Sequence, residues 1–165
     1  GNSSTVCGVD GNACIDCGVN RTCNSGSCEV EPSSRWDLVV VNGRVPQNTS
    51  EGETWDSFGG LPDPYVSLVA QDEEGTQQFE GSSSVATDTL SPNWNEVVLS
   101  DVPARALFRV DIRYRDSDPV SYNTICEKTV LSTEVGPTMF SGDIQTWECD
   151  FGSNAGSIRW RVTPH

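Results

Sequence analysis

The chain lacks several features that would mark common functional classes. Its 165 residues include one histidine, no long apolar run and no cluster of basic side chains. A membrane-spanning helix needs about 20 consecutive apolar residues, and no stretch approaches that length. Ten Lys and Arg residues against twenty-four Asp and Glu residues give a net charge of -14, so no basic surface is available to follow a phosphate backbone. We therefore expect neither a nucleic-acid partner nor a membrane-spanning helix.

The shortage of histidine also argues against catalysis. A Ser-His-Asp or Cys-His site needs a histidine base beside its nucleophile, and the single histidine here is the last residue, His165. The chain has no Gly-x-Ser-x-Gly nucleophile motif. Paired carboxylates can hydrolyse glycosides, but the aspartates here fall in predicted loops of a domain too small for a deep substrate cleft. We expect a binding protein and not an enzyme.

Cysteine, in contrast, is abundant, with seven residues in the chain and five of them between Cys7 and Cys28. This density is rare in a reducing cytosol unless a metal is bound, so we expect a secreted protein of an extracellular or periplasmic, oxidising compartment. Residues 1–34 hold too few aliphatic side chains for an apolar core and need cross-links. A zinc site through Cys14-x2-Cys17 is the alternative. The short spacing to the next pair and the lack of a nearby histidine favour disulfides.

From residue 35 onward, short apolar runs alternate with polar residues, which predicts strands with one buried face. Two runs are clearest; their predicted inward positions are Phe108, Val110, Ile112 and Tyr114 in residues 107–114, and Ile158, Trp160 and Val162 in residues 157–163. Further strands are predicted near residues 36–42, 64–70, 76–88 with an interruption, 94–99, 126–131 and 145–151. Eight strands without a helix predict an all-β, eight-stranded antiparallel β-sandwich over residues 35–165, preceded by the cysteine-rich segment 1–34.

Two acidic clusters fall where predicted strands pass into loops. Asp56 and Asp63 form the first, and Asp116 and Asp118 form the second, with Asn123 close behind. Calcium takes six to eight oxygen ligands, so carboxylates that converge from two loops at one end of a sandwich suit it. Side chains two residues apart on an extended chain point the same way, which lets Asp116 and Asp118 face one ion. The alternative for any single Asp or Asn is a local turn, where its side chain bonds the backbone.

Three blocks carry a resemblance to a known family. They are Asp63-Pro-Tyr-Val66, Ser91-Pro-Asn-Trp-Asn-Glu96 and Asp116-x-Asp118, and in order and spacing they resemble the C2 domain family over residues 36–163. The resemblance implies an eight-stranded sandwich with calcium between three loops at one end, and binding of phospholipid headgroups when calcium is present. The lack of a candidate strand before Trp36, with an extra strand at 157–163, looks like the circularly permuted (type II) C2 topology.

Carried over by position, the resemblance implies a set of calcium ligands. Asp56 and Asp63 match the two first-loop aspartates, Asp116 and Asp118 match the third-loop pair, and Asn123 stands near the fifth acidic ligand. Two departures weaken the match: the first pair is one residue farther apart than usual, and the fifth position is neutral and one residue early. The resemblance therefore implies Ca2+ as the cofactor, with one ion held well and a second held weakly.

The resemblance also implies apolar loop tips that contact the membrane or another partner. Trp55 and Phe58 in the first loop, and Val120 and Tyr122 in the third, are the candidates. Trp and Tyr favour the boundary between apolar and wet regions, although core packing is the alternative for one or two of these side chains. An anionic phospholipid surface is the expected partner. The rival is a glycan or protein partner of an adhesion module, with the loop aromatics stacked on it; the missing lysine-rich strand argues against phosphoinositides.

The two remaining cysteines predict a cross-link within the sandwich. Cys149 falls on the inward face of the predicted 145–151 strand, together with Trp147 and Phe151, and Cys126 follows the third loop. We predict a disulfide between Cys126 and Cys149, which leaves the odd thiol among the five N-terminal cysteines. Two buried free thiols are the alternative.

Overall fold

The computed structural model describes residues 6–7, 15–49, 51–55, 60–117, 122–149 and 156–165. The N-terminal strands are β1 (Val6–Cys7), β2 (Ile15–Asp16), β3 (Arg21–Asn24) and β4 (Ser27–Val30). The longer strands are β5 (Arg35–Arg44), β6 (Pro64–Gln71), β7 (Gln78–Ser82), β8 (Asn93–Pro103), β9 (Arg109–Ser117), β10 (Tyr122–Leu131), β11 (Gln145–Cys149) and β12 (Gly156–Pro164). The short helices are η1 (Ala104–Leu107), α1 (Ser132–Val135) and η2 (Gly136–Phe140).

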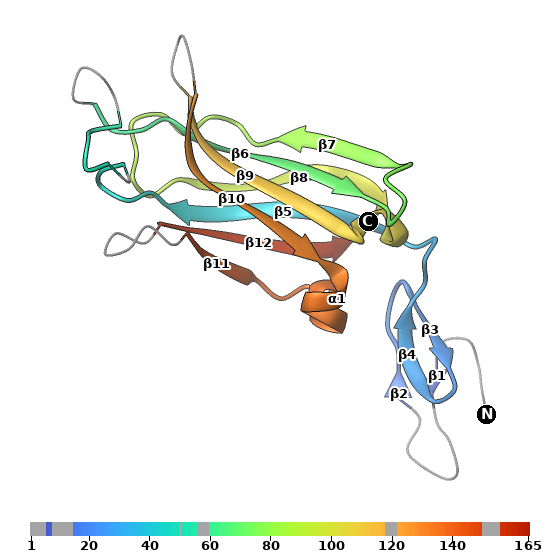
Figure 1. Ribbon diagram of the computed structural model, residues 1–165. Helices are drawn as coiled ribbons and strands as arrows, with labels where there is room; N and C mark the ends of the chain where they lie inside the picture. The colour runs from blue at the N-terminus through green and yellow to red at the C-terminus, as the bar shows by residue number, and fades with distance from the viewer. Residues whose placement is uncertain (1–5, 8–14, 50, 56–59, 118–121, 150–155) are drawn as a thin grey trace.

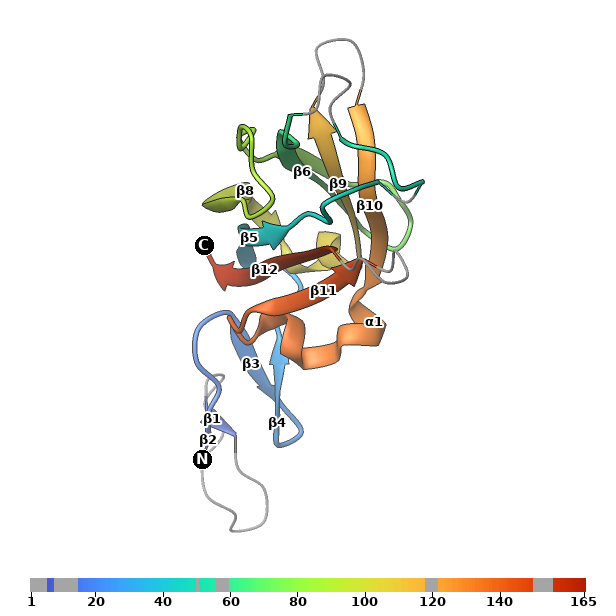
Figure 2. The ribbon, with the colours of Figure 1, turned by 90° about the vertical axis from the view of Figure 1, so that its left-hand side faces the viewer.

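Strands β5 to β12 form two antiparallel four-stranded sheets that pack face to face (Figures 1 and 2). The order is β11-β12-β5-β8 in one sheet and β10-β9-β6-β7 in the other. The predicted eight-stranded sandwich is confirmed, and each predicted strand has its counterpart. Strand β12, the last in the chain, lies between β11 and β5, and β5 is the first sandwich strand among the described residues. This is the permuted topology that the sequence predicts.

The core lies between the sheets, at the alternating positions of the strands. In β9, Val110, Ile112 and Tyr114 are buried, and in β12 the buried positions are Ile158, Trp160 and Val162. Successive side chains of a strand point to opposite faces, so every second residue enters the space between the sheets and leaves water. Trp36 and Trp160 are the largest of the core side chains that are less than 2% exposed.

Two segments differ from the sequence prediction. The strand predicted from residue 107 begins at Arg109, because η1 occupies Ala104–Leu107 and leaves Phe108 half-buried at its end. The prediction of no helix was also wrong at Ser132–Phe140, where α1 and η2 follow β10. These helices are only four or five residues long, too short to show a helical repeat in the sequence. Within the described part of the chain, no helix is long and apolar enough to span a bilayer.

The cysteine-rich segment is held by disulfides and contacts the sandwich. Cys17 bonds Cys28, and Cys23 is also disulfide-bonded. The side-chain amide of Asn20 donates to the carbonyl of Arg35 at 2.7 Å, at the start of β5, and Arg21 donates to a carbonyl of η2 at 2.9 Å. In Figure 1 this segment lies at the end of the sandwich away from the starts of β6 and β10.

The two open sides of the sandwich are joined differently. At the β7–β8 side, the backbone of Gly81 lies against the carbonyl of Val98 with no room for a Cβ. At the β10–β11 side, Cys126 and Cys149 form the predicted disulfide between edge strands of different sheets, with a Cα–Cα distance of 5.8 Å. The predicted disulfide is thus confirmed as a bridge between the sheets.

Candidate metal-binding end of the sandwich

Three of the predicted ligand residues meet where β6 begins, β9 ends and β10 begins. In the β-ladders, Asp116 lies opposite Pro64 on one side and opposite Asn123 on the other. Asp63 directly precedes Pro64, so it sits at the same end of the sheet. Residues 53 positions apart along the chain are thus brought together by strand register alone.

Backbone hydrogen bonds fix the orientation of both aspartates. The amide of Asp63 donates to Oδ1 of Asp116 at 2.6 Å, and the amide of Ser117 donates to the carbonyl of Asp63 at 3.1 Å. Oδ1 of Asp63 accepts the amide of Asp88 at 2.7 Å. The loop between β7 and β8 therefore joins the same cluster through Asp88. Sequence reasoning missed this residue, because nothing local to an exposed turn indicates which distant carboxylate its amide contacts.

Asp116 is a buried carboxylate at the base of the loops. The inward alternation of β9 continues past Tyr114, so Asp116 and Tyr114 are both fully buried, at 0% exposure. Burial raises the pKa of the Tyr114 phenol, and the negative charge of Asp116 raises that pKa further. Burying a charged carboxylate lowers the stability of the fold unless hydrogen-bond donors or a cation compensate for its lost hydration. The amide of Asp63 supplies one such donor.

The described residues supply part of a hard-cation site. Asp63, Asp116 and Asn123 offer carboxylate and amide oxygens, which are the donors that calcium prefers. The other two predicted ligands, Asp56 and Asp118, lie outside the described residues. In the described part of the chain, no group of three or more His, Cys, Asp or Glu side chains is placed to hold a metal ion. The described donor set fits calcium in chemistry.

Comparison with protein-family models and with curated proteins finds no match for the chain. Solved structures of similar fold do exist. A structure of CC2D1B superposes with a TM-score of 0.57 at 18% identity, over 85% of this chain and 57% of that one. The calcium-bound pair of C2 domains of Extended-Synaptotagmin 2 gives 0.57 at 22% identity, over 80% of this chain and 45% of that one. A single C2 domain of plant Extended Synaptotagmin 1 gives 0.54 at 15% identity, over 82% of this chain and 98% of that domain.

The chain has a C2 fold. The plant domain, matched over almost its whole length, decides this, since it contains nothing but the sandwich that the two chains share. The chain spans only about half of the other two structures, so the likeness concerns one domain of each.

In this C2-like domain, Trp55 does not lie at an exposed loop tip. Its side chain is 5% exposed and belongs to the core, and its indole N–H donates to the carbonyl of Pro46 at 2.7 Å. The expectation that Trp55 contacts a membrane or partner is therefore corrected in favour of core packing. Phe58 and Val120 lie outside the described residues, as does the side chain of Tyr122 at the start of β10.

Two other apolar side chains are exposed at this end. Leu61, which precedes Asp63 in the first loop, is 45% exposed, and Val85, in the β7–β8 loop, is 47% exposed. The amide of Ala86 donates to the carbonyl of Pro64, which places Val85 beside the start of β6. Sequence reasoning did not select either residue, because a single aliphatic side chain in a loop carries no periodic signal.

A cavity of about 440 Å³ separates the first loop, which connects β5 to β6, from the start of β10. Its lining residues are Thr49, Glu51, Glu53, Thr54, Trp55, Asn123 and Thr124. Trp55 is the buried member, and the first-loop residues form one wall while Asn123 and Thr124 form the other. The relative position of β10 and the first loop therefore sets the width of this cavity.

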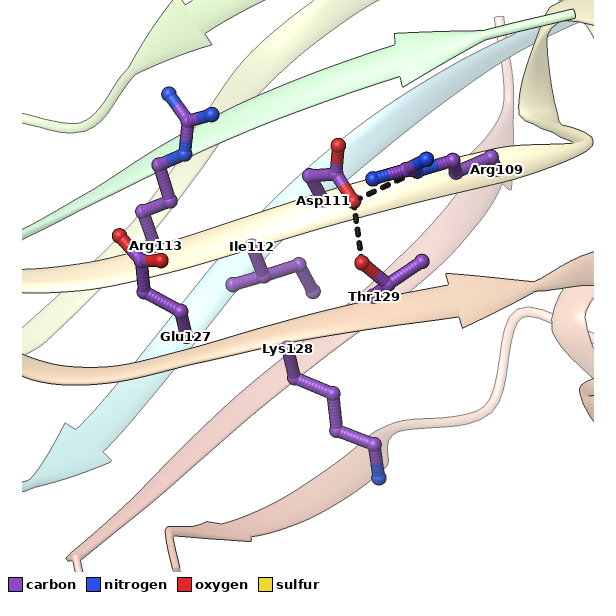
Figure 3. Close-up of a pocket in the computed structure, with 7 residues that line it drawn as sticks. All are labelled: Arg109, Asp111, Ile112, Arg113, Glu127, Lys128 and Thr129. Atoms are coloured by element: carbon purple, nitrogen blue, oxygen red, sulfur yellow. Dashed lines mark hydrogen bonds and ion pairs between the residues drawn. The ribbon is translucent and has the colours of Figure 1, made fainter.

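A smaller hollow of about 210 Å³ lies on β9 and β10 away from this end (Figure 3). Asp111 accepts hydrogen bonds from Arg109 at 2.9 Å and from Thr129 at 2.6 Å. Burial by itself raises the pKa of Asp111, but the bonds from Arg109 and Thr129 outweigh it and the net shift is downward. Arg113 and Glu127 lie on the same surface, so its charges of opposite sign are mixed.

The single histidine also has a defined place. Nδ1 of His165 lies 2.8 Å from Oδ1 of Asp37 and 3.3 Å from Oγ of Ser100. In a Ser-His-Asp relay, the serine and the aspartate contact opposite ring nitrogens. Here both contact Nδ1, so the three side chains do not form that relay.

Proposed function

We propose that this chain is a calcium-binding C2-like module of a secreted protein, which attaches to anionic phospholipid membranes when calcium is bound. The observation that carries the proposal is the convergence of Asp63, Asp116 and Asn123 at one end of the sandwich. The C2 fold supports it, because the calcium-bound Extended-Synaptotagmin 2 domains share that fold.

Asp63 and Asp116 would supply carboxylate oxygens, and Asn123 would supply an amide oxygen. Asp56 and Asp118, on the same two loops, would complete the six to eight oxygens that calcium requires. The backbone amides that hold Asp63 and Asp116 would fix their carboxylates before the ion arrives, so less orientational freedom is lost on binding.

Net charge makes the membrane step depend on the ion. At -14 the metal-free protein is repelled by an anionic surface. Bound calcium supplies positive charge at the loop end and oxygen coordination for headgroup phosphates. Leu61 and Val85, exposed at that end, would then meet the lipid. The disulfides Cys17–Cys28 and Cys126–Cys149 support an oxidising, extracellular or periplasmic location.

The first test is sedimentation with vesicles of phosphatidylserine and phosphatidylcholine at low salt, in millimolar calcium or EDTA. We expect the protein to sediment only with calcium. Asp116→Asn should abolish calcium and vesicle binding. Asp143→Asn is the matched control, since Asp143 is an exposed aspartate in the loop before β11, far from the ligand residues, and it should behave like wild type.

Calcium should also stabilise the fold. An ion that binds only the folded state at about 100 times its Kd adds about 2.7 kcal/mol to the free energy of unfolding. A melting temperature that is the same in calcium and EDTA, with no heat of calcium binding, would refute the metal site. Calcium binding without vesicle binding would refute the membrane role alone. It would favour a glycan or protein partner, to be sought with a glycan array in calcium and in chelator.

A further inference from the structure

We propose that the Cys126–Cys149 disulfide is a positioning clamp that sets the separation of the first loop and β10 at the calcium-binding end. The inference deepens the proposed function, since it concerns the same end of the domain. The two cysteines are not themselves among the predicted ligands, so they act through the segments that they hold.

The disulfide joins strands that share no ladder. Strand β10 is the edge of one sheet and β11 is the edge of the other. Cys149 is the last residue of β11, and Cys126 lies three positions after Asn123 in β10. The cross-link therefore connects the two sheets close to the end where the ligand residues meet.

Cys149 is connected to the first loop through a neighbouring residue that packs closely on that loop. Cys149 pairs with Gly156 in the ladder between β11 and β12. A Cβ on Gly156 would lie 2.9 Å from Pro46 and 3.0 Å from the carbonyl of Arg44, so the backbone packs directly on the start of this loop. The carbonyl of Pro46 in turn holds the indole of Trp55 at 2.7 Å.

Cys126 lies in the same strand, β10, as the residues that line the opposite side of this cavity. Asn123 and Thr124 of β10 face the first-loop wall that contains Trp55 across the 440 Å³ cavity. A register shift interrupts the β9–β10 ladder between Thr124 and Cys126. Such a bulge bends the strand and leaves Ile125 out of the ladder, so the residues before it, which still pair with β9, follow a different path from the rest of β10.

The remaining described link between β10 and β11 side chains is weaker. Nζ of Lys128 lies 4.8 Å from the centre of the Trp147 ring, and Lys128 is exposed to water. Cation–π contacts at exposed sites contribute little. The covalent bond is therefore the strongest described link between these two edge strands, in addition to the packing of the common core. The oxygen ligands of calcium all lie about 2.3 to 2.6 Å from the ion. A change in the separation of the two cavity walls would move ligands out of this range and weaken calcium binding.

The test compares two double variants with calcium chloride as the probe. Cys126→Ser with Cys149→Ser removes the clamp, and Cys17→Ser with Cys28→Ser removes a disulfide of the N-terminal segment at the far end of the molecule. Calorimetric titration is run well below the melting temperature of each. We expect the clamp variant to bind calcium about two- to thirtyfold more weakly, the range of couplings carried by residues outside a binding site, and the control to match wild type.

A second readout needs no calcium. Hydrogen exchange in EDTA should become faster at residues 45–49 and 122–126 in the clamp variant, and unchanged there in the control. Gly156→Ala, which keeps both cysteines, should speed exchange at 45–49 by displacing Pro46. If the cysteine variant fails to fold, this variant tests the packing of Gly156 on Pro46 through which the clamp reaches the first loop, and unchanged exchange at 45–49 would overturn the clamp.

The outcomes separate the clamp from the proposed function. Equal calcium affinity and equal exchange in clamp and control variants would overturn the clamp. Faster exchange at both walls in a protein that binds no calcium would support the clamp and refute the calcium site. Equal losses of affinity in both double variants would show a general loss of stability and would also overturn the clamp.

Discussion

Replacing Tyr114 by Phe tests how the buried end of β9 is organised. Tyr114 is fully buried, and among the described residues its hydroxyl has no hydrogen-bond partner. The hydroxyl packs against Gly43, 2.9 Å from the position that a Cβ would take there. An unsatisfied buried polar group costs about 1–3 kcal/mol, so its removal recovers part of that cost. We expect Tyr114→Phe to leave the free energy of unfolding unchanged or to raise it by up to about 2 kcal/mol.

Urea denaturation in EDTA, followed by tryptophan fluorescence, measures this change. Tyr65→Phe, at a half-exposed position of β6, is the matched control and should stay within about 0.5 kcal/mol of wild type. A loss above about 1 kcal/mol in Tyr114→Phe would show that the hydroxyl makes a hydrogen bond and would refute the reasoning. Because burial and the charge of Asp116 raise the pKa of Tyr114, the same variant should leave the alkaline absorbance titration of the folded protein unchanged.

Two further predictions follow from buried or paired side chains. Trp55→Ala should lower the free energy of unfolding by about 3–5 kcal/mol in urea denaturation, as expected for a core tryptophan. A change below about 0.5 kcal/mol, which is typical of exposed positions, would contradict the burial of Trp55. Burial alone would raise the pKa of Asp37, but hydrogen bonds from the Asp101 amide, His165 and Ser100 outweigh it and lower that pKa. The charged form of Asp37 therefore stabilises the fold fully above about pH 4, and this contribution is lost as the pH falls through the lowered pKa. Asp37→Asn should flatten the fall in unfolding free energy below about pH 4, and an identical acid profile in both proteins would contradict this.

The candidate site was predictable only in part. Asp63 and Asp116 could be selected as a pair because each stands where a predicted strand meets a loop, and the structure joins them through a backbone hydrogen bond. The contribution of Asp88 depends on the path of the β7–β8 loop across the end of β6, which no local pattern encodes. The burial of Trp55 depends likewise on Pro46, nine residues earlier, whose carbonyl accepts its indole N–H.

The sequence by itself determined the strands, since side chains in a strand alternate with a period of two and only one face can leave water. That rule located the buried face of β9 and β12 and the inward position of Cys149, and so the Cys126–Cys149 bridge. Tertiary structure decided which loop side chains are exposed, because loops have no repeat and their burial depends on what packs across from them. It placed Trp55 in the core and left Leu61 in water, although both stand in the same first loop.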